Sequence, residues 1–257
     1  MNMIQSLIIM LSMYTVVPMP MVEWNEKNLK YCMVFLPAAG ILIAALEYLL
    51  FFICRAGEIS SVLYGAASCA LPVLLTGGIH ADGLIDTSDA VGSHGTKEKR
   101  MRILDDPHVG AFGTAGAIIY FLLEAGVMSE LYERTTFQNI IAVLSAFLIS
   151  RAAIAVMIMT LEPSKKSGLL YTFSSAGSRS AVCISAAAVL AICFCLIFYC
   201  FGRYGLISSA GFAALCAYFV RMVRRQFGGL SGDLCGWFIH VAELVLFLCF
   251  MVTAVVK

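Results

Sequence analysis

Hydrophobic residues in this chain occur in long unbroken runs. Runs free of Asp, Glu, Lys and Arg cover residues 31–46, 59–81, 107–123, 135–150, 180–202, 204–220 and 244–256. Each can be extended to about 17 to 25 residues, the length that a helix needs to cross a bilayer. A transmembrane β-barrel would instead show short segments of alternating polarity. The pattern therefore predicts an all-α polytopic integral membrane helical bundle with about seven transmembrane helices.

The N-terminal apolar run, which ends before Pro18, is too short to be an ordinary span. It also lacks the basic start and the small-residue cleavage site of a signal peptide. We expect an interfacial or re-entrant helix there, retained in the protein. Residues 1–257 are then expected to form a single membrane-embedded domain.

The composition supports this class, because 61% hydrophobic and 13% charged residues exclude most soluble proteins. The ten cysteines fall almost entirely inside apolar runs without paired spacing. We interpret them as small buried hydrophobic residues, since a disulfide framework or a CxxC-type metal site would need another pattern. Nothing in the chain suggests a nucleic-acid partner, and the expected surroundings are the lipid bilayer.

The basic residues are distributed unevenly between the two sides that seven spans would create. Four residues fall on one side: Arg55, Arg134, Arg203 and Lys257. Twelve fall on the other: Lys27, Lys30, Lys97, Lys99, Arg100, Arg102, Lys165, Lys166, Arg179, Arg221, Arg224 and Arg225. The positive-inside rule places the richer side in the cytoplasm. We therefore expect a prokaryotic cytoplasmic membrane protein whose loops 18–30, 161–179 and 221–236 lie beside the segment 77–92 on the inner face.

Segment 77–92, GGIHADGLIDTSDAVG, places acidic residues directly after an apolar run. Asp82, Asp86 and Asp89 are spaced i, i+4 and i+7, so a helix would put all three on one face. Carboxylates held so close repel each other unless a cation joins them. Because no set of Cys or His residues accompanies them, oxygen ligation favours Mg²⁺ or Mn²⁺ over Zn²⁺.

A second segment repeats this spacing. GGIHAD (77–82) and GGLSGD (228–233) both place an Asp four residues after a glycine pair, at the cytoplasmic end of an apolar run. We expect Asp233 to face the same layer of the membrane surface as Asp82, although glycine pairs also serve helix packing in membranes. Both explanations stay open on the spacing alone.

Magnesium held by few carboxylates normally shares its coordination with substrate phosphates. Among the nearby cations, Arg100 and Arg225 are the candidates for binding phosphate, and topology accounts for most of the others. His80 adjoins the acidic residues and is expected to orient a carboxylate or a substrate. Glu47 and Glu124 lie in or near apolar spans, where a buried polar contact and a residue that snorkels to the interface both remain open.

These motifs resemble those of the adenosylcobinamide-GDP ribazoletransferases, also called cobalamin synthases, over nearly the whole chain. The matching pieces are TVVPMP, GGIHADGLIDTSDAVG, RMRILDDPHVGAFG, the KSGLL loop that begins at Lys166, and FGGLSGDLCGWFIHVAE. The resemblance implies a membrane enzyme with one catalytic domain. It would join adenosylcobinamide-GDP to α-ribazole or its 5′-phosphate and release GMP, using Mg²⁺.

The resemblance also implies roles for individual residues. Asp82, Asp86 and Asp89 match the acidic core, which with His80 is expected to carry catalysis. The expected metal ligands are Asp82, Asp86, Asp89 and Asp233. The expected substrate-binding residues are Arg100, Asp106, Lys166, Arg225, Gly228 and Gly229. The sequence leaves open whether the protein forms a homo-oligomer.

Two alternatives compete with this interpretation. A CDP-alcohol phosphotransferase also uses an aspartate cluster with Mg²⁺ at the membrane edge, but its signature contains an Ala-Arg pair that DGLIDTSDAVG lacks. A transporter would carry polar groups near the bilayer midplane on broken helices, whereas here they concentrate in loops and at helix ends.

Overall fold

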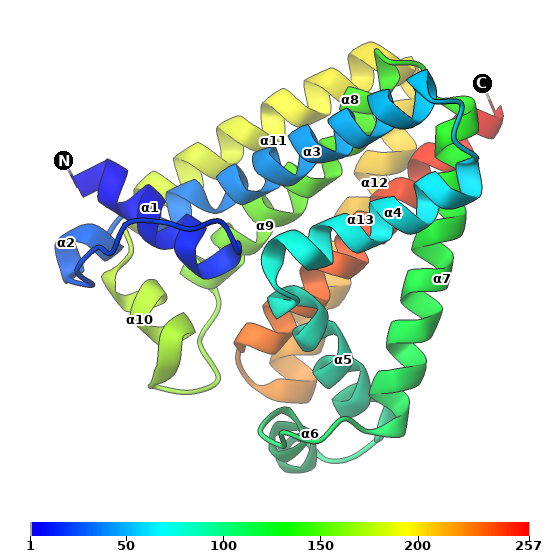
Figure 1. The fold of residues 1–257 in the computed structure, drawn as a ribbon. Coiled ribbons are helices and arrows are strands. Elements are labelled where there is room, and N and C mark those ends of the chain that lie inside the picture. The colour runs from blue at the N-terminus through cyan, green and yellow to red at the C-terminus, as the bar shows by residue number, and fades with distance from the viewer. Residues whose placement is uncertain (1, 257) are drawn as a thin grey trace.

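The computed structural model describes residues 2–256 as a bundle of helices (Figure 1). The α-helices are α1 (Asn2–Tyr14), α2 (Glu26–Leu29), α3 (Leu36–Ala56), α4 (Ser61–Thr76), α5 (Ile79–Gly92), α6 (Lys97–Leu104), α7 (Ala111–Arg134), α8 (Asn139–Leu144), α9 (Ala146–Thr160), α10 (Gly168–Ala176), α11 (Arg179–Phe201), α12 (Gly205–Met222) and α13 (Gly232–Val256). Short 3₁₀ turns, η1 (Cys32–Phe35) and η2 (Gly202–Tyr204), and a π-helical turn, η3 (Val223–Phe227), lie between them. The predicted all-α class is confirmed.

Several helices are long and apolar enough to cross a membrane. Within the described residues five stretches qualify: 26–56, 111–134, 139–160, 179–227 and 232–255. The bent pair α4 and α5 makes six if it is counted as one span. The stretch 179–227 contains both α11 and α12, and α12 turns back from the upper end of α11 (Figure 1). The polytopic membrane character is confirmed, and the number of about seven stays a prediction.

The chain bends by 102° between α4 and α5. Helix α4 ends at Gly77 (φ 64°), and Gly78 (φ 80°) precedes α5. Both residues adopt the left-handed conformation, which glycine reaches without the steric cost of a Cβ. The bend sends α5 toward the lower end of the molecule (Figure 1), so the glycine pair separates the apolar helix from the acidic one.

Helix α13 lies at the centre of the bundle, where it packs against α5, α7, α9 and α12. Its contact with α5 depends on two glycines. A Cβ on Gly83 would lie 2.6 Å from the carbonyl oxygen of Asp233, and one on Gly236 would lie 2.8 Å from that of His80. Glycine at such a crossing lets two backbones approach closely. The beginning of α13 is thereby held against the first turns of α5.

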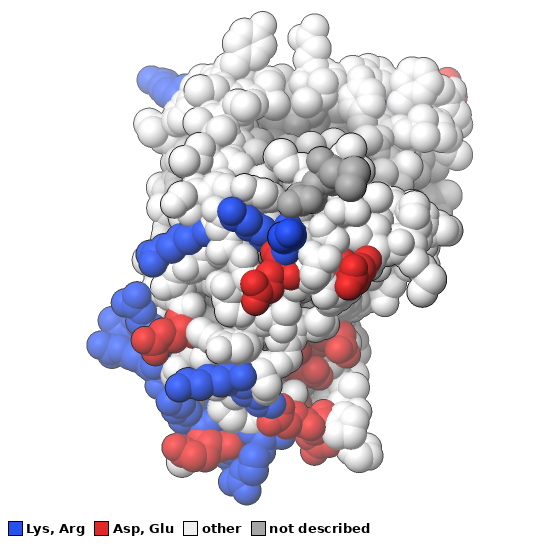
Figure 2. Space-filling view, turned by 90° about the vertical axis from the view of Figure 1, so that its left-hand side faces the viewer, with Lys and Arg blue, Asp and Glu red and all other residues white. Residues whose placement is uncertain are grey.

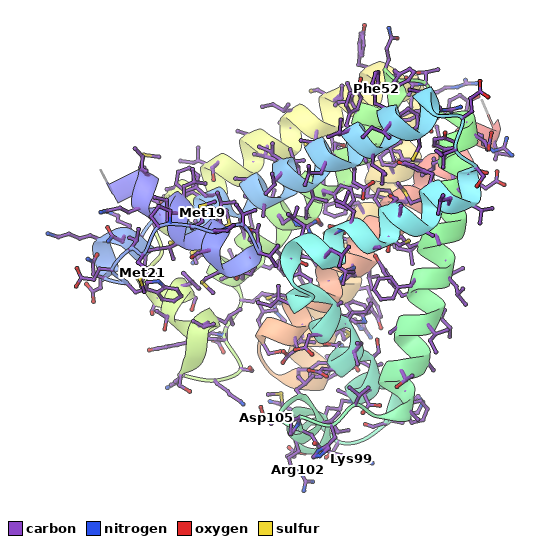
Figure 3. All side chains as sticks on the ribbon, in the orientation of Figure 1. Met19, Met21, Phe52, Lys99, Arg102 and Asp105 are labelled. Atoms are coloured by element: carbon purple, nitrogen blue, oxygen red, sulfur yellow. The ribbon has the colours of Figure 1, made fainter. Side chains whose placement is uncertain are left out.

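Charged side chains gather on the lower and middle parts of the face in Figure 2, and residues of other kinds cover most of its upper part. The lower end carries α5, α6 and the beginning of α13 (Figure 1). Figure 3 shows Lys99, Arg102 and Asp105 together there and the exposed Phe52 at the opposite end. The acidic motif therefore belongs to the polar end of the bundle.

Candidate active site

The acidic residues of both repeated segments meet at one place. Asp82 and Asp233 line a single cavity, although they are 151 positions apart in the chain. Asp82 lies on the first turn of α5, and Asp233 lies on the first turn of α13. The structure thus brings together the two carboxylates that the repeated Gly-Gly spacing singles out.

The first turn of α13 is shaped by the loop before it. Gly228 (φ 73°) ends the π-helical turn, and Leu230 pairs with Pro163 in an isolated parallel bridge. Within this bridge the amide of Ser164 donates to the Leu230 carbonyl at 2.8 Å, and that of Leu230 donates to the Glu162 carbonyl at 2.8 Å. Because these bonds fix the loop just ahead of Asp233, they also fix where its carboxylate stands.

Asp86 lies one turn after Asp82 and interacts electrostatically with Asp82, Asp233 and Asp89. Asp233 in turn interacts with Asp82 and with Asp105, the residue that ends α6. Because α5 (Ile79–Gly92) contains Asp82, Asp86 and Asp89, helical periodicity places them on the expected shared face, and Asp233 and Asp105 lie near it. Like charges that interact in this way favour binding of a cation.

Asp89 has a different environment from its two neighbours. The amide of Gly113, in the first turn of α7, donates a 3.1 Å hydrogen bond to Asp89 Oδ1. A Cβ on Gly110 would lie 2.1 Å from Oδ2 of the same carboxylate. A carboxylate at a helix N-terminus satisfies free amides and meets the positive end of the helix dipole. Asp89 therefore caps α7 from the neighbouring helix.

The carboxylates of this site suit a magnesium ion that keeps most of its water ligands. Among the described residues no group of three His, Cys, Asp or Glu side chains is close enough to enclose a metal ion. Magnesium, however, usually keeps several waters and takes only one or two carboxylates together with substrate phosphates. One or two carboxylates from the set Asp82, Asp86 and Asp233 would fit this mode, because all three are oxygen donors that interact with one another.

The cavity beside Asp82 and Asp233 has a volume of about 190 Å³ and mostly apolar walls. His80 lines it and stacks on Tyr14, with ring centroids 5.6 Å apart and an interplanar angle of 25°. Phe173 of α10 closes another wall. Sequence reasoning missed Tyr14 and Phe173, since aromatic residues in apolar segments give no signal of a site.

A second groove of about 240 Å³, which a larger number of polar side chains line, adjoins the cavity. The two share Leu169, Leu170, Gly232 and Asp233. Lys165 lines the groove and forms an ion pair with Asp105. Lys166, the predicted substrate-binding residue, is exposed and does not line this groove. The lysine of this pair that lines the groove is therefore Lys165, and substrate binding by Lys166 stays a prediction.

The other predicted cations lie at the edge of this region. Arg100 donates to Gln226 of the π-helical turn, and Lys97 lies against Gly228. Arg225 is exposed on the same turn. Gly229 packs against the backbone of Pro163 and Ser164. These contacts join α6 to the loop that carries Asp233, so Gly228 and Gly229 have a packing role in the structure.

Asp106 has a hydrogen-bond partner outside the acidic cluster. It is exposed, and it accepts hydrogen bonds from the ring Nδ1 (2.7 Å) and the backbone amide (3.0 Å) of His108. These bonds hold the pKa of Asp106 below its usual value. Asp106 lines neither the cavity nor the groove, so the structure gives no contact that would support substrate binding by this residue.

The comparisons with known proteins agree with this geometry. A family model described as cobalamin-5-phosphate synthase matches residues 6–252. The chain belongs to this family. An adenosylcobinamide-GDP ribazoletransferase from Lachnoclostridium phytofermentans is 35% identical over 251 residues, which cover 95% of this chain and 92% of the relative. One from Clostridium botulinum is 32% identical, with 95% and 96% covered, and one from Clostridium perfringens is 31% identical, with 91% and 92% covered. No solved structure matches the chain significantly.

This member of the cobalamin-5-phosphate synthase family also contains polar pairs deep in its bundle. Arg151 of α9 and Glu243 of α13 form an ion pair, and both side chains are 1% exposed. His240 Nδ1 lies 3.1 Å from the Tyr120 hydroxyl. His240 and Glu243 therefore each have a partner inside the bundle.

Two further glutamates are buried in the bundle. Glu47 and Glu124 are 0% and 3% exposed, and Glu47 accepts a 2.8 Å hydrogen bond from Ser68. The sequence left open whether these glutamates make buried polar contacts or snorkel to the interface, and the structure shows buried polar contacts. An isolated charge in an apolar span is the sequence signal that could also have found Arg151 and Glu243.

Proposed function

We propose that this protein joins adenosylcobinamide-GDP to α-ribazole, or to α-ribazole 5′-phosphate, in the last steps of cobalamin biosynthesis. A ribose hydroxyl of the acceptor attacks the phosphate next to cobinamide, the diphosphate bond breaks and GMP leaves. Membership of the family over residues 6–252 supports the activity. The observation that carries the site is the convergence of Asp82 and Asp233 on one cavity.

The residues of the groove provide a place for the charged part of the donor substrate. Lys165 lies on its wall, and Arg100 is held nearby by Gln226. Cationic side chains stabilise a diphosphate through charge-assisted hydrogen bonds. Of the cations predicted for this role, Arg100 has a fixed position, while Arg225 and Lys166 project from exposed turns.

Asp82, Asp86 and Asp233 are the residues that would hold Mg²⁺. When bound, the ion would neutralise the charge of the diphosphate during the transfer. Asp82 and Asp86 are fixed on one helix, and the packing of Gly83 against Asp233 holds the third carboxylate beside them. The role of Asp89 as proton acceptor or further ligand stays a prediction, and its hydrogen bond to Gly113 supports a positioning role.

The proposed location is the cytoplasmic membrane of a prokaryote, with the site facing the cytoplasm. The excess of basic residues in the loops beside the acidic segment supports this orientation. The gathering of charged side chains toward the lower end in Figure 2 is consistent with it.

The deciding experiment is a product assay with the purified full-length protein. Incubation with adenosylcobinamide-GDP, α-ribazole and Mg²⁺ should release GMP and form adenosylcobalamin in equal amounts, and Asp82→Asn should abolish both. Replacing the donor with a CDP-alcohol should give no CMP. Release of CMP without use of the corrinoid would support the phospholipid enzyme instead, and uptake into proteoliposomes without GMP release would support a transporter.

A further inference from the structure

The apolar cavity beside the carboxylates has no assigned role in the proposed transfer. Asp82 and Asp233 form only one part of its wall. Five other elements also contribute to the wall, represented by Met13 of α1, Met33 of η1, Leu36 of α3, Ile158 of α9 and Phe173 of α10. Residues from so many helices form a preformed concave site next to reactive groups, the usual setting of a ligand pocket.

The size and walls of the cavity restrict what it can bind. An apolar cavity of about 150 Å³ accommodates benzene, and this one measures about 190 Å³. That volume suits a small fused aromatic ring and is far below the size of a corrin macrocycle. Apolar side chains on most sides disfavour polar groups that would lose hydrogen bonds to water.

One residue of the wall carries a polar atom that lacks a partner. His80 is 5% exposed, and its Nε2 has no hydrogen-bond partner among the described residues. Its ring stacks on Tyr14, which also lines the cavity. Since a buried ring nitrogen without a partner is costly, a ligand able to complete this bond gains from binding there.

We propose that the cavity binds the benzimidazole ring of α-ribazole, an assignment that rests on the proposed function. Of the parts of the two substrates, this ring is the one that is small, flat and largely apolar, while guanosine and the diphosphate match the polar groove. A turn of the His80 ring toward the cavity lets Nε2–H donate to the free ring nitrogen. The ribose then lies toward Asp82 and Asp233, where the cavity meets the groove.

This placement makes a prediction about the accepted bases. A riboside of 5,6-dimethylbenzimidazole should be a better acceptor than one of adenine. Adenine carries an exocyclic amine and additional ring nitrogens, and the apolar walls around Ile158 and Ile239 offer these atoms no hydrogen bonds.

The test narrows the cavity without touching the carboxylates. Ile158→Phe should raise the KM for α-ribazole about tenfold or more and leave the KM for adenosylcobinamide-GDP within about twofold. The matched control is Ala44→Phe, which adds a Phe side chain to a separate apolar pocket between α3, α8 and α11 and should change neither KM. Free 5,6-dimethylbenzimidazole should inhibit the wild type competitively against α-ribazole alone.

Two further variants test the same assignment in case Ile158→Phe does not fold. Ile158→Ala should enlarge the cavity and improve the use of a bulkier benzimidazole riboside relative to α-ribazole. His80→Phe keeps an aromatic ring against Tyr14 and should raise the KM for α-ribazole without raising the KM for adenosylcobinamide-GDP. If the wild type releases no GMP, the proposed function fails. If it does, and the Ile158 variants leave acceptor use unchanged or alter only the corrinoid KM, the cavity assignment is overturned.

Discussion

The amide of Gly113 donates a 3.1 Å hydrogen bond to Oδ1 of Asp89, so a residue of the acidic motif caps the neighbouring helix α7. The bond joins α5 to the beginning of α7 at the polar end of the bundle. One of the three aspartates that the sequence groups together thus differs from the other two in what it contacts.

This contact predicts that Asp89 tolerates substitution by asparagine better than Asp82 does. Asp89→Asn keeps an oxygen that accepts from Gly113, so GMP release should fall less than in Asp82→Asn. Asp89→Ala removes the acceptor and should lower stability by about 1 kcal/mol. Steady-state rates and thermal unfolding in detergent measure both effects. Two results together would contradict this interpretation: equal loss of activity in Asp89→Asn and Asp82→Asn, and unchanged stability in Asp89→Ala. They would indicate that Asp89 is a metal ligand or a catalytic base.

The crossing of α5 and α13 predicts strong sensitivity at Gly83. Its added Cβ in Gly83→Ala would lie 2.6 Å from the Asp233 carbonyl oxygen, so the two helices must separate. A displacement of about 1 Å between catalytic groups lowers rates about a hundredfold, and the kcat for GMP release should fall on that scale.

The matched control for Gly83 is Gly126→Ala on α7, where an added Cβ meets nothing within 4 Å. This variant should keep full activity and gain about 0.5–1 kcal/mol, because alanine is favoured over glycine in a helix. Normal activity in Gly83→Ala would show that the close crossing does not set the distance between the carboxylates.

The carboxylate cluster predicts dependence on a divalent cation. Removal of metal with EDTA should stop GMP release, and added Mg²⁺ should restore it. Asp233→Asn should raise the Mg²⁺ concentration for half-maximal activity, because the cluster loses one charge. Glu130→Gln serves as the control, since Glu130 pairs with Arg134 on the surface of α7 away from the cluster. Full activity after exhaustive metal removal would rule out this use of the aspartates.

The polar groove predicts different roles for two adjacent lysines. Lys165→Ala should raise the KM for adenosylcobinamide-GDP about tenfold, since the side chain lines the groove beside Asp233. Lys166→Ala should have a smaller effect, because the residue is exposed and outside the groove. Substrate titration at saturating α-ribazole measures both. A larger effect at Lys166 would restore the role that the motif alone suggested.

The buried ion pair of Arg151 and Glu243 predicts that loss of one partner destabilises the protein. Replacing the other partner as well should restore most of the stability. Glu243→Leu leaves the buried guanidinium without its partner and should cost about 3–5 kcal/mol. The double variant Arg151→Met with Glu243→Leu should recover most of that loss, since an apolar pair of similar volume is tolerated. Thermal unfolding in detergent provides the comparison. A double variant as unstable as the single one would contradict this account.

The amino-acid sequence by itself determined the membrane helices and the composition of the acidic site. Both are local properties: a continuous apolar run needs a helix to satisfy its backbone in lipid, and Asp82, Asp86 and Asp89 share a face through helical periodicity. The glycine pairs were also visible, and the left-handed conformations of Gly77, Gly78 and Gly228 match the turns that such pairs predict.

The tertiary structure alone decided which distant residues meet. The approach of Gly83 to Asp233, the capping of α7 by Asp89 and the pairing of Arg151 with Glu243 join positions 150, 24 and 92 residues apart. Periodicity describes one helix at a time, so it cannot specify the partner that packing supplies. The cavity behind the carboxylates arises in the same way, because its walls come from helices whose sequences are simply apolar.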